Sequence, residues 1–203
     1  MLQVDRIPAH VGWYMAGFTD GEGSFNVSFR PRGDYSLPWK VSLCFNISQR
    51  DPVILALFKK HLECGTMRQR QDGVWYYEVN NLQPILENVI PFFRRFGFLS
   101  AKKKRDFAKF VELAEMFKAG KHLHRSGIEE ILRIRSDMND GGKRRYADAD
   151  ILVLFEKSSE TARQTVPVSA ERMIQSDLHG NMQSAAEMTA PGGTSPSNNN
   201  ERS

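Results

Sequence analysis

Two carboxylates and two glycines alternate in a short stretch near the N-terminus, where Asp20 and Glu22 are interleaved with Gly21 and Gly23. Hard carboxylate oxygens are the ligands that Mg²⁺ prefers. The preceding residues are mostly apolar or small, and we expect a helix over residues 10–20 that the glycines end. Glu22 would then lie at the end of this helix, with its carboxylate available to a cation.

Gly17 and Gly21 are four residues apart and therefore share one face of the predicted helix. A face of small residues lets the backbone of a second helix approach closely. If that helix belongs to a second copy of the chain, two copies of Glu22 meet near a two-fold axis and need a cation between them. The alternative is an ordinary buried helix followed by a turn, with Glu22 in solvent.

The residues after Ser24 alternate between apolar and polar, which predicts strands over residues 24–30 and 39–48. The apolar set faces the core. The outward set is polar or cationic and includes Ser28, Arg30, Lys40, Ser42, Cys44 and Asn46. A two-stranded ribbon fits the major groove of DNA, and an outward face without acids suits that partner. The alternative is a solvated sheet face.

The remaining pattern predicts two more strands and several helices. Asp72-Gly73 is a hairpin signal between strands 66–70 and 74–79, and Arg68 and Arg70 would extend the cationic face. Helices are expected over residues 52–62, with Val53, Leu57 and Phe58 buried, and over 82–96, 101–119, 126–138 and 146–157, with an interruption near Pro91. The mixture predicts an α+β fold.

Two groups of cations occur where phosphates could be bound. Residues 102–105 are all Lys or Arg and fall in the first turn of a helix that Ser100 is expected to cap, where positive charge opposes the helix dipole. Lys143 and Arg144 fall in a glycine-containing loop that could wrap a nucleic-acid backbone. In each case the alternative is a solvated surface.

Composition limits the class of protein. The 203 residues carry a net charge of +4. Residues 1–157 hold 25 basic and 19 acidic residues, and residues 158–203 hold 3 and 5, so the basic charge lies in the first part. We expect a disordered tail over residues 158–203. Two cysteines make no disulfide framework, and we find neither a membrane span nor a signal pattern. An intracellular, non-secreted protein of the bacterial cytoplasm or an organelle is predicted.

The stretch Met15-Ala16-Gly17-Phe18-Thr19-Asp20-Gly21-Glu22-Gly23 resembles the motif of LAGLIDADG homing endonucleases, with Glu22 where aspartate is common. Three further segments are similar to the family in the same order: Phe45–Gln49, Leu99–Lys104 and Met138–Lys143. The likeness is to the single-motif, intron-encoded, homodimeric branch. It implies an αββαββα core, with an antiparallel sheet forming a DNA-binding saddle and C-terminal helices. Residues 1–9 would be a lead-in and residues 10–157 the endonuclease domain.

The resemblance also implies roles for individual residues. Glu22 and the carbonyl of Gly21 would bind Mg²⁺, for which Mn²⁺ can substitute; Gln49 would orient water and Lys102 would act on the phosphate, with Lys103 as the next candidate. The dimer interface would include Trp13, Ala16, Gly17 and Asp20. The DNA-binding residues would be Ser28, Arg30, Arg32, Lys40, Ser42, Cys44, Asn46, Arg68, Arg70, Lys143 and Arg144.

These roles imply a site-specific endonuclease that cuts both strands of a long pseudo-palindromic DNA site as a homodimer. The alternative is a non-cleaving member of the same family that binds RNA as an intron maturase or DNA as a regulator.

Overall fold

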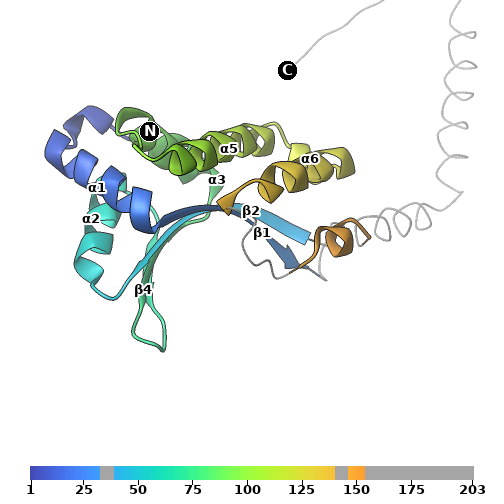
Figure 1. The fold of residues 1–203 in the computed structure, drawn as a ribbon, viewed down its shortest axis with the longest axis horizontal. Coiled ribbons are helices and arrows are strands. Elements are labelled where there is room, and N and C mark those ends of the chain that lie inside the picture. Colours follow the sequence, from blue (N-terminus) through green and yellow to red (C-terminus); the bar gives the residue numbers. More distant parts are fainter. Residues whose placement is uncertain (33–38, 140–145, 154–203) are drawn as a thin grey trace, which may run out of the picture. The chain divides into compact units, whose positions relative to one another are not determined.

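A computed structural model describes residues 1–32, 39–139 and 146–153. Its centre is a four-stranded antiparallel sheet with the strand order β1-β2-β4-β3. Helices pack on one side of this sheet, and α5 and α6 run above β1 and β2 in Figure 1. The predicted α+β class and the helix–strand–strand–helix–strand–strand–helix order are confirmed. Lys143, Arg144 and the predicted tail lie outside the described residues.

The first long helix is α1 (Ala9–Glu22), preceded by the short 3₁₀ turn η1 (Val4–Arg6). It continues two residues beyond the predicted end, so Gly21 is helical and the chain enters the sheet directly at Gly23. Met15 and Ala16 are buried against the core, whereas Trp13 and Tyr14 are exposed. This helix therefore has apolar residues on both its inner and its outer side.

The strands are β1 (Gly23–Pro31), β2 (Trp39–Gln49), β3 (Thr66–Gln69) and β4 (Trp75–Val79). Period-two alternation places one set of side chains in the core, as the sequence predicted. Phe25 is the centre of this core, since its ring contacts Phe45, Phe93, Phe98, Phe107 and Phe110. The other set, which includes Ser28, Ser42 and Asn46, is directed away from the core.

The helix α2 (Pro52–Leu62) begins at Asp51, whose carboxylate accepts a hydrogen bond from the Val53 backbone N–H at 2.9 Å. Ile54, Leu55 and Phe58 are buried. The prediction that Val53 is buried was wrong, because its side chain is 71% exposed in the first turn. Residues 53–58 are all apolar, so the sequence pattern does not indicate which of them face inward.

The predicted interruption at Pro91 takes a specific form. A turn of α-helix, α3 (Leu82–Pro84), leads into the π-helical segment η2 (Ile85–Val89) and then α4 (Ile90–Arg95). Pro91 lacks a backbone N–H and is accommodated in the first turn of α4, directly after the wider π turn.

The last described helices complete the layer above the sheet: α5 (Ala101–Lys118), the 3₁₀ turn η3 (Lys121–Leu123) and α6 (Arg125–Ser136), with residues 148–153 also helical. Ser100 caps α5 as predicted, since its Oγ accepts a hydrogen bond from the Lys103 N–H at 3.2 Å. Within the described ranges, every helix is too short or too polar to cross a membrane.

Candidate functional site

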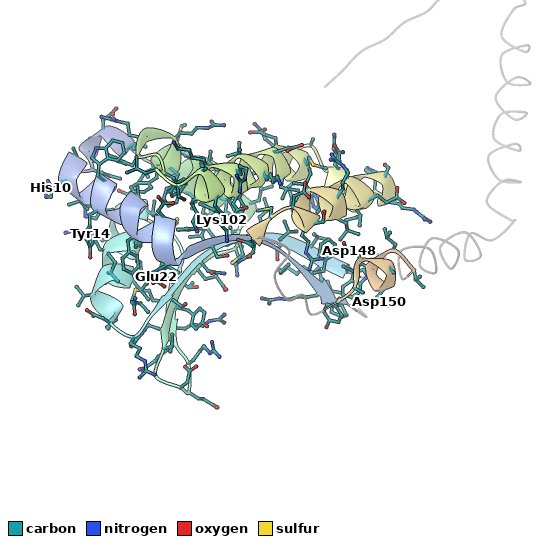
Figure 2. All side chains as sticks on the ribbon, in the orientation of Figure 1. His10, Tyr14, Glu22, Lys102, Asp148 and Asp150 are labelled. Carbon is teal, nitrogen blue, oxygen red and sulfur yellow. The ribbon has the colours of Figure 1, made fainter. Side chains whose placement is uncertain are left out.

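Glu22 is exposed at the C-terminal end of α1, where the chain passes into β1 (Figure 2). The turn is tight at Gly23, because a Cβ there would lie 2.4 Å from Cγ2 of Thr19. Thr19 is itself buried and donates its hydroxyl to the Met15 carbonyl at 2.9 Å. The sequence therefore holds the Glu22 backbone in a fixed junction while its carboxylate remains accessible.

Asp20 joins this junction to the start of α5. Its carboxylate accepts hydrogen bonds from the backbone N–H groups of Leu99 at 3.2 Å and Ser100 at 3.0 Å, and from the Ser100 hydroxyl. Burial raises the pKa of Asp20, but these hydrogen bonds and the nearby Lys103 outweigh it and leave the pKa below its ordinary value. In this protomer Asp20 thus positions α5 against α1, a role that its predicted place at a dimer interface did not include.

We expect Asp20→Ala to lower the free energy of unfolding by about 1–2 kcal/mol, the size of a lost helix cap. Because the native pKa of Asp20 is depressed, its contribution is present above the ordinary value of 3.8 and is lost as the pH falls through the native pKa. Urea unfolding of the wild-type protein and of Asp20→Ala from pH 7 to pH 2 measures this difference in the free energy of unfolding. A difference that persists unchanged at pH 2 would contradict the assigned hydrogen bonds.

Lys103 is the cation that points into the junction. It is 8% exposed, and its ammonium donates a hydrogen bond to the Gly23 carbonyl. Burial lowers its pKa, while the carboxylates of Asp106, Asp20 and Glu22 act in the opposite direction, and the net pKa is below the ordinary value. The neighbouring Lys102, the first candidate from the sequence, is exposed.

Asp106 lies one turn after Lys103 on α5 and is 4% exposed. Its Oδ1 accepts a hydrogen bond from the Asn139 N–H at 3.2 Å, and its Oδ2 is buried with no hydrogen-bond partner among the described residues. The Asn139 amide donates to the Phe25 carbonyl at 2.9 Å and to Oδ1 of Asn26 at 3.2 Å. This network ties the segment after α6 to the outer edge of β1.

Gln49 ends β2 and is partly exposed. Its Oε1 accepts a hydrogen bond from the Arg50 backbone N–H at 2.9 Å, which fixes the side chain and leaves the amide NH₂ as a donor. The arrangement is compatible with the predicted role in orienting water.

The outward face of the sheet lines a cavity of about 700 Å³, hereafter the groove. Its lining includes most of the predicted DNA-binding residues of the first two strands: Ser28, Arg30, Ser42, Cys44 and Asn46. Lys40 lines a smaller neighbouring cavity together with Arg30, and Arg32 follows the end of β1. Cys44 is only 8% exposed, and burial followed by the charge of Glu78 raises its pKa to about 11. Its thiol is therefore part of the groove floor.

The two arginines of the β3–β4 hairpin differ in their surroundings. Arg70 follows β3, and its guanidinium lies 5.1 Å from the Tyr76 ring centre, donates to the Tyr76 hydroxyl and pairs with Asp72 at 3.5 Å. Arg68 pairs with Glu78 at 3.4 Å. Both arginines are exposed, and both are held by partners on β4 or the turn before it.

The outer side of α1 carries a row of exposed positions that no other described residue covers. A Cβ added at Gly17 or Gly21 would meet no atom within 4 Å. Trp13 is 52% exposed. Leu99, whose backbone N–H donates a hydrogen bond to Asp20, is 89% exposed. His10 and Tyr14 lie along the same outer side (Figure 2). Ala16, predicted with this row, is 1% exposed and faces the core instead.

The described residues contain no group of three or more His, Cys, Asp or Glu side chains placed to hold a metal ion. Glu22 is an available carboxylate, whereas Asp20 is occupied by α5. Mg²⁺ typically binds one or two carboxylates together with substrate phosphates and waters. Of these two carboxylates, Glu22 is therefore the one available to a metal ion.

Two contributing residues were not predicted from the sequence, although a signal for each exists. Asp106 follows Lys103 by three positions, which puts both on one helix face. Glu78 occupies an outward position of the strand that contains the inward residues Tyr77 and Val79. Asp106 lies near Lys103, and Glu78 pairs with Arg68. The sequence pattern identified the two cations as candidates without these carboxylates.

Comparison with known proteins finds matches in sequence and in fold. The model of a family described as LAGLIDADG endonuclease matches residues 15–114. The chain is 34% identical over 84 residues to the DNA endonuclease I-CvuI of Chlorella vulgaris, a match that covers 39% of this chain and 52% of that protein. The chain thus spans about half the length of that relative.

Solved structures of homing endonucleases also match the fold of this chain. An archaeal intron-encoded homing endonuclease, I-Vdi141I complexed with DNA, has a TM-score of 0.65 at 27% identity, covering 73% of this chain and 96% of that one. The homing endonuclease I-LtrWI bound to target DNA has a TM-score of 0.62 at 28% identity, covering 66% of this chain and 46% of that one.

Proposed function

Because this chain belongs to the LAGLIDADG endonuclease family, we propose that it is a homing endonuclease that cuts both strands of a specific DNA site. The observation that carries the proposal is the position of Glu22, exposed at the end of a helix whose outer glycine row is open. A second copy packed on that row would bring two such carboxylates together at one centre.

We propose that Glu22 and the Gly21 carbonyl of each copy hold Mg²⁺, with Mn²⁺ able to substitute. The bound metal would supply an activated water and charge stabilisation at the leaving oxygen. Gln49 would orient water through its free amide NH₂, since its oxygen is engaged by Arg50. The groove would hold the DNA, with the outward side chains of β1 and β2 contacting base edges.

Lys103 is the better candidate for the lysine that acts on the phosphate. Its buried ammonium donates a hydrogen bond to the Gly23 carbonyl, and the nearby charges of Asp106, Asp20 and Glu22 favour its protonated form, whereas Lys102 is exposed. A preorganised cation costs no rearrangement when negative charge develops on the phosphate. Lys102 would instead contact the DNA backbone.

We expect Lys103→Ala to lower the single-turnover cleavage rate by about 10²–10³-fold, the usual effect of removing one stabilising group. Lys102→Ala should keep that rate at saturating DNA and weaken binding instead, with a shallower salt dependence. Thermal unfolding of both variants checks that the junction is intact. If Lys102→Ala loses the rate and Lys103→Ala does not, the original assignment to Lys102 stands.

The proposed working unit is a homodimer on a long pseudo-palindromic site. This chain covers nearly all of I-Vdi141I but about half of I-LtrWI. The I-LtrWI chain therefore has room for two units of this size, and the I-Vdi141I chain has room for one. Two-fold symmetry of the protein would require two-fold related half-sites in the DNA. Because I-Vdi141I is an intron-encoded homing endonuclease, we propose an intron origin for this chain as well.

Selection from a randomised duplex library, followed by cleavage of the selected sites, tests the function. We expect the bound sites to share two related half-sites, and Mg²⁺ to produce double-strand breaks that EDTA prevents. Specific binding with no cutting under any divalent cation would favour the non-cleaving maturase or regulator. Failure to enrich any duplex sequence would refute the DNA endonuclease.

A further inference from the structure

Glu78 is a carboxylate on the face that the proposed function assigns to DNA. Among the described residues that line the groove, which include Asn26, Cys44 and Asn46, Glu78 is the acidic one. In the sheet it lies on β4 opposite Asn46 of β2 and Thr66 of β3, which places it centrally and not at an edge. An acid in this position repels phosphates, so affinity for DNA alone does not explain it.

Both carboxylate oxygens of Glu78 are held by neighbours. Oε1 accepts a hydrogen bond from the Asn80 amide at 3.1 Å, and Oε2 lies 3.4 Å from Nη2 of Arg68 and 3.9 Å from the Cys44 thiol. The Glu78 side chain is 16% exposed, whereas that of Arg68 is 63% exposed. The acceptor is therefore fixed at the groove wall, and the donor beside it stands out from the surface.

Stability is a weak reason for this pair. An ion pair with one largely exposed partner contributes little to stability. Arg68 and Glu78 are diagonal neighbours on adjacent strands, because Arg68 is opposite Tyr76, and such pairs add little to a sheet. What the pair does provide is a donor and an acceptor side by side: Glu78 lines the groove, and the largely exposed Arg68 lies next to it.

A C·G base pair presents the complementary pattern in the major groove. Cytosine offers the N4 amino donor, and guanine offers the O6 and N7 acceptors. N4 and O6 are joined by a hydrogen bond and so lie about 3 Å apart. That spacing is close to the 3.4 Å between Nη2 of Arg68 and Oε2 of Glu78.

The following inference rests on the proposed function. We propose that Arg68 and Glu78 together recognise one C·G base pair in each half-site, and we call this pair the reading unit. Glu78 accepts from the cytosine amino group, and Arg68 donates to the guanine. Cys44 and Asn80 are positioning residues that keep the carboxylate in place.

Selection from a randomised duplex library with the full chain and two variants tests this. We expect Arg68→Ala and Glu78→Gln to reduce the preference for C·G about tenfold at the same position of each half-site, leaving other positions unchanged. Glu78→Gln should move the preference toward A·T, because glutamine pairs with adenine. Glu115→Gln, which alters an exposed ion-paired carboxylate on α5, is the matched control and should change no position.

Thermal unfolding shows whether each variant folds, and the two variants test the pair independently. The inference is overturned if the variants change different base pairs, if neither changes any, or if binding weakens equally on all sequences. A wild-type chain that enriches no sequence refutes the proposed function itself, whereas unaltered selectivity in variants of a selective protein refutes only the reading unit.

Discussion

Glu22→Gln is expected to abolish DNA cleavage while leaving DNA binding intact. The substitution keeps the size of the side chain and removes the charge that a divalent cation requires. We expect the single-turnover cleavage rate to fall by about 10³-fold or more, since both centres of a homodimer lose their carboxylate. Affinity for the selected site should stay the same or rise, because a negative charge facing the phosphates is gone.

The chain provides a matched control for this result. Glu112→Gln removes the same charge from an exposed position on α5 and should leave cleavage unchanged. Because Glu22 is exposed at a helix end and accepts no hydrogen bond from the described residues, the variant should unfold at the wild-type temperature. Undiminished cleavage by Glu22→Gln in Mg²⁺ would remove Glu22 from the catalytic centre.

The sheet could be predicted from the sequence because each strand buries one face. Alternation of apolar and polar residues then specifies both the strand and its orientation, as at Phe25, Val27 and Phe29. The orientation of α1 could not be predicted in this way, because both of its sides are apolar. Trp13 lies outside and Ala16 inside, and only the packing of the core decides between them.

The choice between Lys102 and Lys103 shows the same limit at the candidate site. Four consecutive cations occupy the first turn of α5, so the sequence places a positive charge there without indicating which one faces inward. The answer depends on how Asp20 fixes the start of α5 and on the junction at Gly23, which are contacts about 80 residues apart in the chain. Local pattern contains no information about such contacts.

Gly17→Leu is expected to separate folding from assembly. The added side chain meets nothing in the protomer, since a Cβ at Gly17 has no neighbour within 4 Å. Replacing a mid-helix glycine should stabilise the isolated protomer by about 0.5–1 kcal/mol. In the proposed dimer the same side chain would stand between two helices that must cross closely, so we expect a monomer by sedimentation and loss of double-strand cleavage.

Two other substitutions distinguish this result from a general effect of adding side-chain atoms. Ala108→Leu enlarges an exposed side chain on α5 and should leave both assembly and cleavage unchanged. Gly12→Ala should lower the free energy of unfolding by about 1–3 kcal/mol, because its Cβ would lie 2.3 Å from Cζ of the buried Phe96 ring. If Gly17→Leu remains a cleaving dimer, the open glycine row is not where two copies meet, and Glu22 would need another partner to complete a metal site.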